Sequence, residues 1–150
     1  MPRPAAPTTP SENASSASTA GYSGKPLSQK LGLKAGQRVR LVRAPADYWT
    51  LCGFDAGELT LIARNNQAFD FGHIFATERV ELERELPALT AALDRGGMLW
   101  VSWPKKASKV PTDIGEDTLR ELILPLGLVD VKVCAVTAVW SGLKFLRRRE

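Results

Sequence analysis

The pattern of apolar and polar residues along the chain predicts short strands separated by short helices. Strand periodicity is visible where Val39, Leu41 and Arg43 alternate with the residues between them. Apolar runs or alternation of this kind occupy six segments, which are 38–44, 59–63, 69–76, 98–103, 129–136 and 143–148. Helices are predicted in four segments, which are 27–32, 47–53, 78–94 and 113–127. The pattern is that of an alternating α/β protein that ends in two strands.

The longest predicted helix, 78–94, carries a leucine stripe at offsets of four, three and four residues. The stripe consists of Leu82, Leu86, Leu89 and Leu93. This spacing places the leucines on one helix face, which we expect to pack on the sheet. Pro87 lies inside the pattern and lacks a backbone N–H, so we expect a kink or two abutting helices. Gly96 and Gly97 are expected to end the helical segment.

The last third of the chain predicts one helix and a hairpin. Asp113 and Glu116 resemble a capping box with Asp in place of Ser or Thr, and the helix that they start is expected to end at Gly127. Its inward positions are Leu119, Leu122, Ile123 and Leu126. The two final strands are expected to form a β-hairpin with its turn around Trp140-Ser141-Gly142.

Alternating strands and helices predict a Rossmann-like, three-layer α/β fold whose mostly parallel sheet ends in an antiparallel hairpin. Right-handed crossovers place successive parallel strands side by side. We therefore expect the strand order 59–63, 38–44, 69–76, 98–103, 143–148, 129–136, with 143–148 antiparallel. In this order Lys105 lies at the same edge of the sheet as Pro45, and a ligand site is expected among the Pro45 turn, the end of the His73 strand and the Lys105 loop.

Residues 1–20 are mostly Pro, Ala, Ser and Thr, with almost no large apolar side chains. Ordering them would cost backbone entropy that no burial offsets, so we expect a disordered tail followed by one domain over 21–150. The chain has neither the apolar region of a secretory signal nor an apolar run long enough to span a bilayer. We expect a soluble protein with no membrane partner.

Charge and cysteine content narrow the function classes. The formal net charge of +4 favours anionic ligands but falls short of the dense basic face of a DNA-binding protein, so nucleic acid is not favoured as a partner. Cys52 and Cys134 have no spacing typical of a metal site or a disulfide framework. The sequence therefore predicts no metal, and a cytoplasmic location fits the cysteine content.

From Arg38 onward, the order of elements resembles that of a class I methyltransferase. The resemblance implies a cofactor turn directly after the first strand, and such turns are rich in glycine so that the backbone approaches the cofactor closely. Here the turn is Arg43-Ala44-Pro45-Ala46-Asp47. Because this turn lacks glycine, we expect neither S-adenosylmethionine nor a dinucleotide, and no cofactor is predicted.

Longer motifs resemble a family of small bacterial Rossmann-like proteins known only as a domain of unknown function. The motifs are Gly21-Tyr22-Ser23-Gly24, Leu99-Trp100-Val101-Ser102-Trp103-Pro104-Lys105-Lys106, Gly127 to Val136, and Trp140-Ser141-Gly142-Leu143-Lys144. The resemblance covers the whole region after the tail. It implies the fold and the compartment, and it implies no activity.

The candidate ligand residues gather after the 98–103 strand. Lys105 and Lys106, with Ser108 and Lys109, follow its carboxyl end, where ligands bind in open α/β sheets, and they form either an anion clamp or a solvated basic loop. Trp103 and Trp140 form an apolar wall for a ring or pack in the core. Asp47 completes the expected site.

Lys132 and Lys144 lie on the two arms of the hairpin and are expected to meet across it, which is repulsive unless an anion lies between them. His73 is the only histidine in the chain, and we expect it to be a packed core residue. Asp113 and Asp117 are interpreted as helix-cap and first-turn charges rather than metal ligands.

These features favour a non-catalytic or weakly catalytic module that binds an anionic small molecule or a protein partner, over an enzyme. The alternative is a diverged methyltransferase-like enzyme, whose lysines would stabilise negative charge that develops during the reaction. Nucleic-acid binding is the third hypothesis, and it requires an affinity that falls steeply with added salt.

Overall fold

The computed structural model describes residues 26–64 and 66–147. The expected tail and the Gly21-Tyr22-Ser23-Gly24 motif lie outside these residues. The elements are α1 (Leu27–Leu31), β2 (Arg38–Val42), α2 (Tyr48–Cys52), the 3-10 helix η1 (Ala56–Glu58), β3 (Thr60–Ile62), β4 (Phe69–Phe75), α3 (Arg79–Ala92), β5 (Leu93–Pro104), the 3-10 helix η2 (Lys106–Ser108), α4 (Glu116–Ile123), the 3-10 helix η3 (Leu124–Leu126), β6 (Leu128–Ala135) and β7 (Trp140–Arg147).

The strands form one six-stranded sheet in the order β3-β2-β4-β5-β7-β6. β2 pairs in parallel with both β3 and β4, and β4 pairs in parallel with β5. β7 is antiparallel to β5 on one side and to β6 on the other. The predicted strand order is confirmed, including the insertion of the last strand between β5 and β6.

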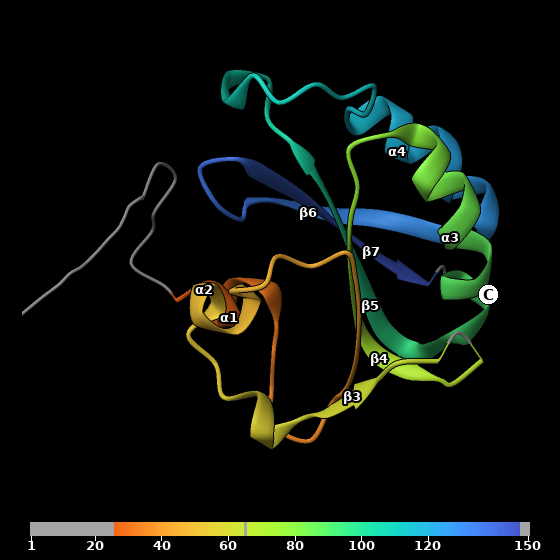
Figure 1. Cartoon of the computed structure of the whole chain (residues 1–150). Coiled ribbons are helices and arrows are strands. Elements are labelled where there is room, and N and C mark those ends of the chain that lie inside the picture. Colours follow the sequence, from red (N-terminus) through yellow and green to blue (C-terminus); the bar gives the residue numbers. More distant parts are fainter. Residues whose placement is uncertain (1–25, 65, 148–150) are drawn as a thin grey trace, which may run out of the picture.

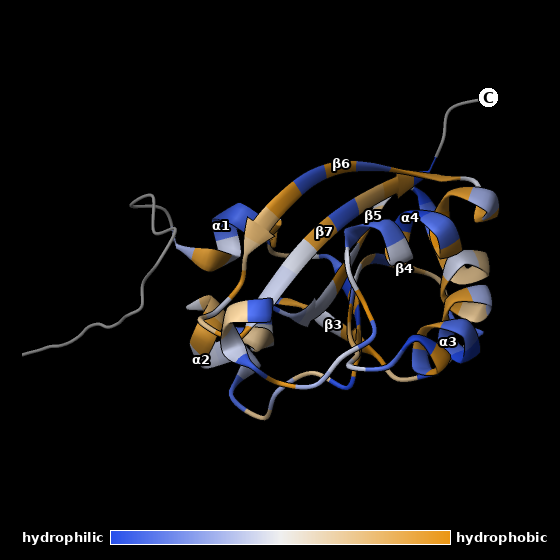
Figure 2. Ribbon diagram, turned by 90° about the horizontal axis from the view of Figure 1, so that it is seen from above, coloured by the Kyte–Doolittle hydropathy of each residue, from blue (hydrophilic) through white to orange (hydrophobic). Residues whose placement is uncertain are grey.

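Helices cover the sheet on both faces, as the pattern of alternating elements predicts (Figure 1). One core lies under α3 and α4 and includes Leu82, Leu119 and Val101. The other lies under α1 and α2 and includes Leu31, Tyr48 and Trp100. Figure 2 shows the same arrangement from above, with the helices on either side of the sheet. We call these the α3 face and the α1 face. The Rossmann-like three-layer fold is confirmed.

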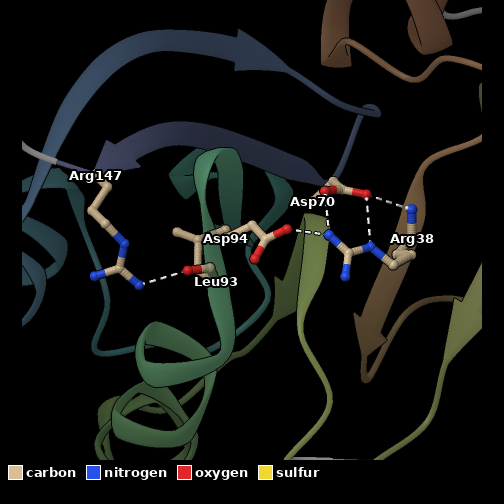
Figure 3. Close-up of polar contacts among 5 residues, drawn as sticks. All are labelled: Arg38, Asp70, Leu93, Asp94 and Arg147. Atoms are coloured by element: carbon tan, nitrogen blue, oxygen red, sulfur yellow. Dashed lines mark hydrogen bonds and ion pairs between the residues drawn. The ribbon is translucent and has the colours of Figure 1, made fainter.

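The amino ends of the parallel strands are joined by a charged network (Figure 3). Arg38, the first residue of β2, donates from Nη2 to Oδ1 of Asp70 at 2.8 Å and from Nε to Oδ2 of Asp70 at 3.2 Å. The same guanidinium is paired with Asp94 at the start of β5. Nearby, Arg147 of β7 donates to the carbonyl of Leu93 at 2.7 Å. Side chains of β2, β4, β5 and β7 therefore fix the strand ends at this edge.

The helical segments differ from the predictions in two places. α3 runs as one helix with Pro87 inside it, so the prediction of two abutting helices is wrong. Because Pro87 is exposed, we expect water to satisfy the carbonyl that loses its donor. α4 starts after Gly115, and Asp113 instead accepts a hydrogen bond from the Arg79 amide at 2.7 Å, at the start of α3. The predicted Asp113 cap thus belongs to a different helix.

Two strand boundaries differ from the predictions by more than two residues. β5 begins at Leu93, directly after α3, so Gly96 and Gly97 lie in the strand at a register shift rather than at a helix end. The Trp140-Ser141-Gly142 segment begins β7 instead of forming the hairpin turn. A Cβ on Gly142 would lie 2.9 Å from Val136 and 3.2 Å from Trp100, so the strand needs glycine at this position. In the part of the chain that the structure describes, no helix has the length and apolarity needed to cross a membrane.

Candidate functional site

The carboxyl ends of β2, β4 and β5 lie along one edge of the sheet because these strands are parallel. From β2 the chain moves outward to β3 and then returns past β2 to β4. The direction of winding therefore reverses between β2 and β4. Ligands of open α/β sheets bind where this reversal occurs, outside the carboxyl ends of the strands. We call residues 43–47 and 76–81, which follow β2 and β4, the switch edge.

The turn after β2 has an unusual backbone at Arg43, whose φ of 60° lies in the left-handed region. Glycine is the residue that most readily adopts this conformation. The next three residues, Ala44, Pro45 and Ala46, have small side chains, and the Pro45 carbonyl accepts from the Tyr48 amide at 3.1 Å as α2 begins. Asp47 is exposed and makes no cap hydrogen bond to α2. This turn is tight and carries little side-chain bulk.

Across the switch edge, Glu81 of α3 faces Arg43. Its carboxylate accepts from the amides of Thr77 at 3.0 Å and Glu78 at 3.2 Å, and it lies 3.3 Å from Nη1 of Arg43. Burial acts to raise the pKa of Glu81, but these two amides and the Arg43 charge outweigh it, so the pKa lies below its ordinary value. Glu81 is therefore ionised and holds Arg43 at the switch edge. The Arg43 side chain remains 41% exposed.

Under the turn lies a buried chain of polar side chains. The Tyr48 hydroxyl is 2.9 Å from Nδ1 of His73, and Nε2 of His73 is 2.8 Å from Oγ of Ser102. Tyr48 belongs to α2, His73 to β4 and Ser102 to β5. These hydrogen bonds thus connect α2, the helix that follows the turn, to β4 and β5.

His73 is 1% exposed, and its burial lowers its pKa to about 3. Burial is also the main cause that raises the pKa of Tyr48 well above its ordinary value and the pKa of the Cys52 thiol to about 12. All three groups are therefore neutral near pH 7. The expectation that His73 is a packed core residue agrees with this burial. The contribution of His73 to the site is to position α2.

The Lys105 loop uses its polar groups internally. The amide of Lys105 donates to the Val139 carbonyl at 2.7 Å, which joins the loop to the hairpin. The Ser108 hydroxyl donates to the Lys105 carbonyl at 2.6 Å and accepts from the Val110 amide at 3.2 Å. Lys106 is exposed. Ser108 is thus committed to a local turn, and the lysine side chains are what the loop offers to a ligand.

The two tryptophans of the expected apolar wall lie on opposite faces of the sheet. Trp103 is 7% exposed in the core of the α3 face. Trp140 is half-buried on the α1 face, where its ring meets Phe75 edge-on at 5.1 Å between centroids. The two rings do not form one wall, because they belong to separate layers.

The hairpin lysines meet as predicted. Lys132 lies directly opposite Lys144 in the β6–β7 pair, and Lys144 lies opposite Trp100 in the β5–β7 pair. Lys105 belongs to the same neighbourhood, because Lys30, Lys132 and Lys105 all act on the pKa of the Cys134 thiol, against the larger effect of its burial. The structure therefore places Lys132 opposite Lys144 and brings both Lys105 and Lys132 near Cys134, while Ser108 is bonded to the Lys105 backbone.

The sequence predicted no site role for four residues of the site: Arg43, Glu81, Tyr48 and Ser102. The left-handed conformation of Arg43 has no signal in residue type, since an arginine there looks like an ordinary strand end. Ser102 gave a usable signal, because a serine inside an apolar strand must find a hydrogen-bond partner when it is buried. Its partner, His73, was the only histidine available.

Comparison with known proteins identifies related folds. No protein-family model matches the chain, and no curated protein matches it significantly. A putative type 11 methyltransferase from Sulfolobus solfataricus superposes with a TM-score of 0.60 at 12% identity, over 83% of this chain and 90% of that one. A ribosomal protein L11 methylase from Lactobacillus delbrueckii subsp. bulgaricus gives 0.51 at 12% identity, over 81% and 74%. The structure named as the DhpI–SAH complex gives 0.52 at 11% identity, over 75% and 78%.

At these identities the similarity concerns the fold, which is that of class I methyltransferases, as the order of elements suggested. It also corrects two expectations. The sequence argued against an enzyme and against any cofactor, yet two of these neighbours are named for methyl transfer and the third is a complex with SAH. The turn after β2 lacks glycine, and Arg43 itself adopts the left-handed conformation there. The resemblance to the family of unknown function rests on its motifs alone.

Proposed function

We propose that the chain is a methyltransferase-like enzyme that binds S-adenosylmethionine at the switch edge. The observation that carries the proposal is the sheet order β3-β2-β4-β5-β7-β6, with its winding reversal between β2 and β4 and its inserted antiparallel β7. This topology puts the turn after β2 where α/β folds bind nucleotide cofactors. The methyltransferase neighbours support the same reading. The non-catalytic binding module is the weaker reading beside them.

The residues of the turn fit the cofactor in shape. The left-handed Arg43 lets the chain turn sharply at the end of β2, and the next three residues, Ala44, Pro45 and Ala46, have small side chains. Carbonyl groups of this turn are suited to accept from the ribose hydroxyls. Pro45 offers no N–H, so the donors must come from its neighbours.

The charges of the turn fit the amino-acid end of the cofactor, which carries a carboxylate and an ammonium group. Arg43 is suited to the carboxylate, because its guanidinium is half-exposed and offers several donors. Asp47, four residues on, is suited to the ammonium, since its carboxylate makes no cap hydrogen bond. To reach the cofactor, Arg43 leaves Oε2 of Glu81, and the Thr77 and Glu78 amides, which both donate to Oε1, keep one oxygen of that carboxylate bonded.

When bound, the cofactor supplies an electrophilic methyl group for transfer to a nucleophile. The protein's own contribution is to hold that group in position. The Tyr48–His73–Ser102 chain fixes α2, and with it the turn, against β4 and β5. Positioning of this kind accounts for a large share of catalysis in group transfer.

Binding is tested with S-adenosylmethionine and S-adenosylhomocysteine on the full chain, by calorimetry and thermal denaturation. A ligand at one hundred times its Kd stabilises the folded state by about 2.7 kcal/mol, which corresponds to roughly 5–10 °C in a chain of this size. Transfer itself is tested by incubation with methyl-labelled cofactor and a search for labelled products. No stabilisation by either ligand at millimolar concentration would refute the proposal.

The site is tested with Arg43→Gln, which we expect to weaken binding about tenfold or more, because a hydrogen bond between charged groups contributes about 1.5–3 kcal/mol. The matched control is Arg95→Gln. Arg95 is an exposed arginine near the start of β5, at the opposite edge of the sheet. Equal binding by both variants would place the cofactor elsewhere.

The proposal includes the cytoplasmic location that the sequence suggested. Cys52 and Cys134 are both free thiols, a state that a reducing compartment maintains.

A further inference from the structure

The α1 face carries a group of lysines outside the switch edge. Lys132 and Lys144 lie opposite one another on β6 and β7. Directly opposed residues of an antiparallel pair have their Cβ atoms about 4.5–5.5 Å apart, and like charges there are destabilising. In the neighbouring β5–β7 pair, Lys144 lies opposite Trp100 of β5. The sheet therefore holds two ammonium groups close together.

α1 brings further positive charge to the same place. Nζ of Lys132 donates to the carbonyl of Lys30 at 3.3 Å, and Nε1 of Trp100 donates to the carbonyl of Leu31 at 2.8 Å. Both acceptors belong to the last turn of α1, which lies beside the end of β6 (Figure 2). Lys34 follows this helix by three residues. We call Lys34, Lys105, Lys132 and Lys144 the lysine patch.

Electrostatics agree with this grouping. Burial lowers the pKa of Lys144, and the charges of Lys132 and Lys34 lower it further. Lys105 and Lys132 both act on Cys134, which lies on the same face, opposite Gly142. Lys34 and Lys132 thus act on Lys144, and Lys105 and Lys132 act on Cys134, whose partner Gly142 is two residues from Lys144 along β7.

No carboxylate of the described residues balances this charge. All eight ion pairs of residues 26–64 and 66–147 use arginine, and none involves a lysine of the patch. The acidic residue of β6, Asp130, is bonded to Arg120 of α4 at 3.1 Å, on the α3 face. The repulsion between Lys132 and Lys144 is therefore not relieved by a carboxylate of the described residues.

We propose that the lysine patch binds a phosphate group of a ligand. Lysine ammonium groups are compact point charges whose donors rotate freely, and they bind phosphate without needing the planar geometry that arginine imposes. Several ammonium groups from different directions suit a multiply charged, tetrahedral anion. The side chains are reachable, because Lys34 and Lys132 are exposed and Lys105 and Lys144 are half-exposed.

The first test measures binding of inorganic pyrophosphate to the full chain by calorimetry at low ionic strength. We expect binding that weakens at least tenfold in Lys132→Gln and in Lys144→Gln. Lys109→Gln is the matched control, since Lys109 is an exposed lysine of the Lys105 loop outside the patch. Pyrophosphate binding that all three variants retain equally, or no pyrophosphate or oligonucleotide binding at all, would overturn the proposal.

A second arm identifies the source of the phosphate. A single-stranded oligonucleotide is titrated at two salt concentrations under the same conditions. Binding of pyrophosphate, with the losses expected above, indicates a small phosphorylated ligand. Binding of the oligonucleotide alone, lost in Lys132→Gln and weakened by salt, indicates a nucleic-acid backbone.

A third measurement separates a ligand site from a structural role. Without ligand, Lys132→Gln removes a like charge, so its unfolding temperature is expected to equal or exceed that of the unaltered chain. Saturating pyrophosphate is expected to raise the unfolding temperature of the unaltered chain and to raise that of Lys132→Gln by a smaller amount. A variant that loses stability without ligand, and gains as much from pyrophosphate as the unaltered chain, would show that Lys132 serves the fold alone.

Discussion

Acidification to pH 5 is predicted to destabilise the protein through His73. This histidine is neutral in the folded state because burial lowers its pKa to about 3, whereas in the unfolded chain its pKa is about 6.5. Below pH 6.5 the unfolded state therefore binds a proton that the folded state does not, and stability is lost as the pH falls toward 3. Proton linkage therefore lowers the free energy of unfolding by about 2 kcal/mol between pH 7 and pH 5. Below pH 6 the free energy of unfolding falls by about 1.4 kcal/mol per pH unit.

The assay is urea denaturation at pH 7, 6 and 5, followed by the fluorescence of the four tryptophans, on protein without a histidine tag. A loss of 2 kcal/mol lowers the urea midpoint by about 1 M if the denaturant slope is near 2 kcal/mol per M. Because the chain has one histidine, His73→Gln should abolish this pH dependence whatever its own stability at pH 7. The carboxylates with resolved shifts, Asp70 and Glu81, have lowered pKa values and change protonation below this range.

The prediction is wrong if the stability of His73→Gln depends on pH as strongly as that of the unaltered chain. It is also wrong if the histidine ring protons titrate near pH 6.5 in the folded state. The second measurement uses NMR on the unaltered chain, so it holds even where the variant does not fold.

Two further predictions concern the amino edge of the sheet. Asp70→Asn should lower the urea midpoint at pH 7, because Arg38 lowers the pKa of Asp70 through its hydrogen bonds. The difference in midpoint from the unaltered chain should shrink below about pH 4, as Asp70 loses its charge in both the unfolded and the folded state. Equal midpoints at pH 7 would contradict this prediction. Gly97→Ala should lower the free energy of unfolding by about 1–3 kcal/mol. The alanine Cβ would lie 2.8 Å from the Asp70 carbonyl oxygen and 3.0 Å from that of Asp94, and these backbone atoms move little. An unchanged urea midpoint would show that the strand ends can shift apart.

The sheet order was predictable from sequence because each step had a local cause. Alternating elements require crossovers, crossovers have one hand, and two strands without a helix between them must fold back. Each of these three rules depends on the order of the elements, so it holds even when the predicted end of an element is wrong by a few residues. The sequence placed the start of β5 five residues too late, at Met98 instead of Leu93, and the order was unaffected.

What could not be predicted depends on contacts between distant segments. Asp113 has the spacing of a cap for its own helix, yet it caps α3 because the loop before α4 passes the amide of Arg79. Gly142 looked like a turn residue, and it is a strand residue that leaves room for Trp100. Each residue type suited two environments, and only the tertiary arrangement selects between them.

The candidate site likewise has features that follow from local structure and features that depend on contacts between distant segments. The meeting of Lys132 and Lys144 followed from the hairpin alone, which is a local structure. The approach of Lys34 and Lys105 required the positions of α1 and the β5 loop, which no pattern in the sequence encodes. Arg43 went unnoticed because its significance lies in a backbone angle.

The distribution of charge separates the parts of the sheet that serve stability from the parts available to ligands. At the amino edge, Arg38 is bonded to Asp70 and Asp94, and Arg147 donates to the Thr90 and Leu93 carbonyls, so these arginines hold the strand ends together. At the switch edge, Arg43 is paired with Oε2 of Glu81 while its side chain stays 41% exposed, so a ligand can reach it. On the α1 face, the lysine patch has no carboxylate partner among the described residues. The two proposed sites thus differ in what holds their cations in place: Arg43 is held by a carboxylate, and Lys132 is held by a backbone carbonyl of α1.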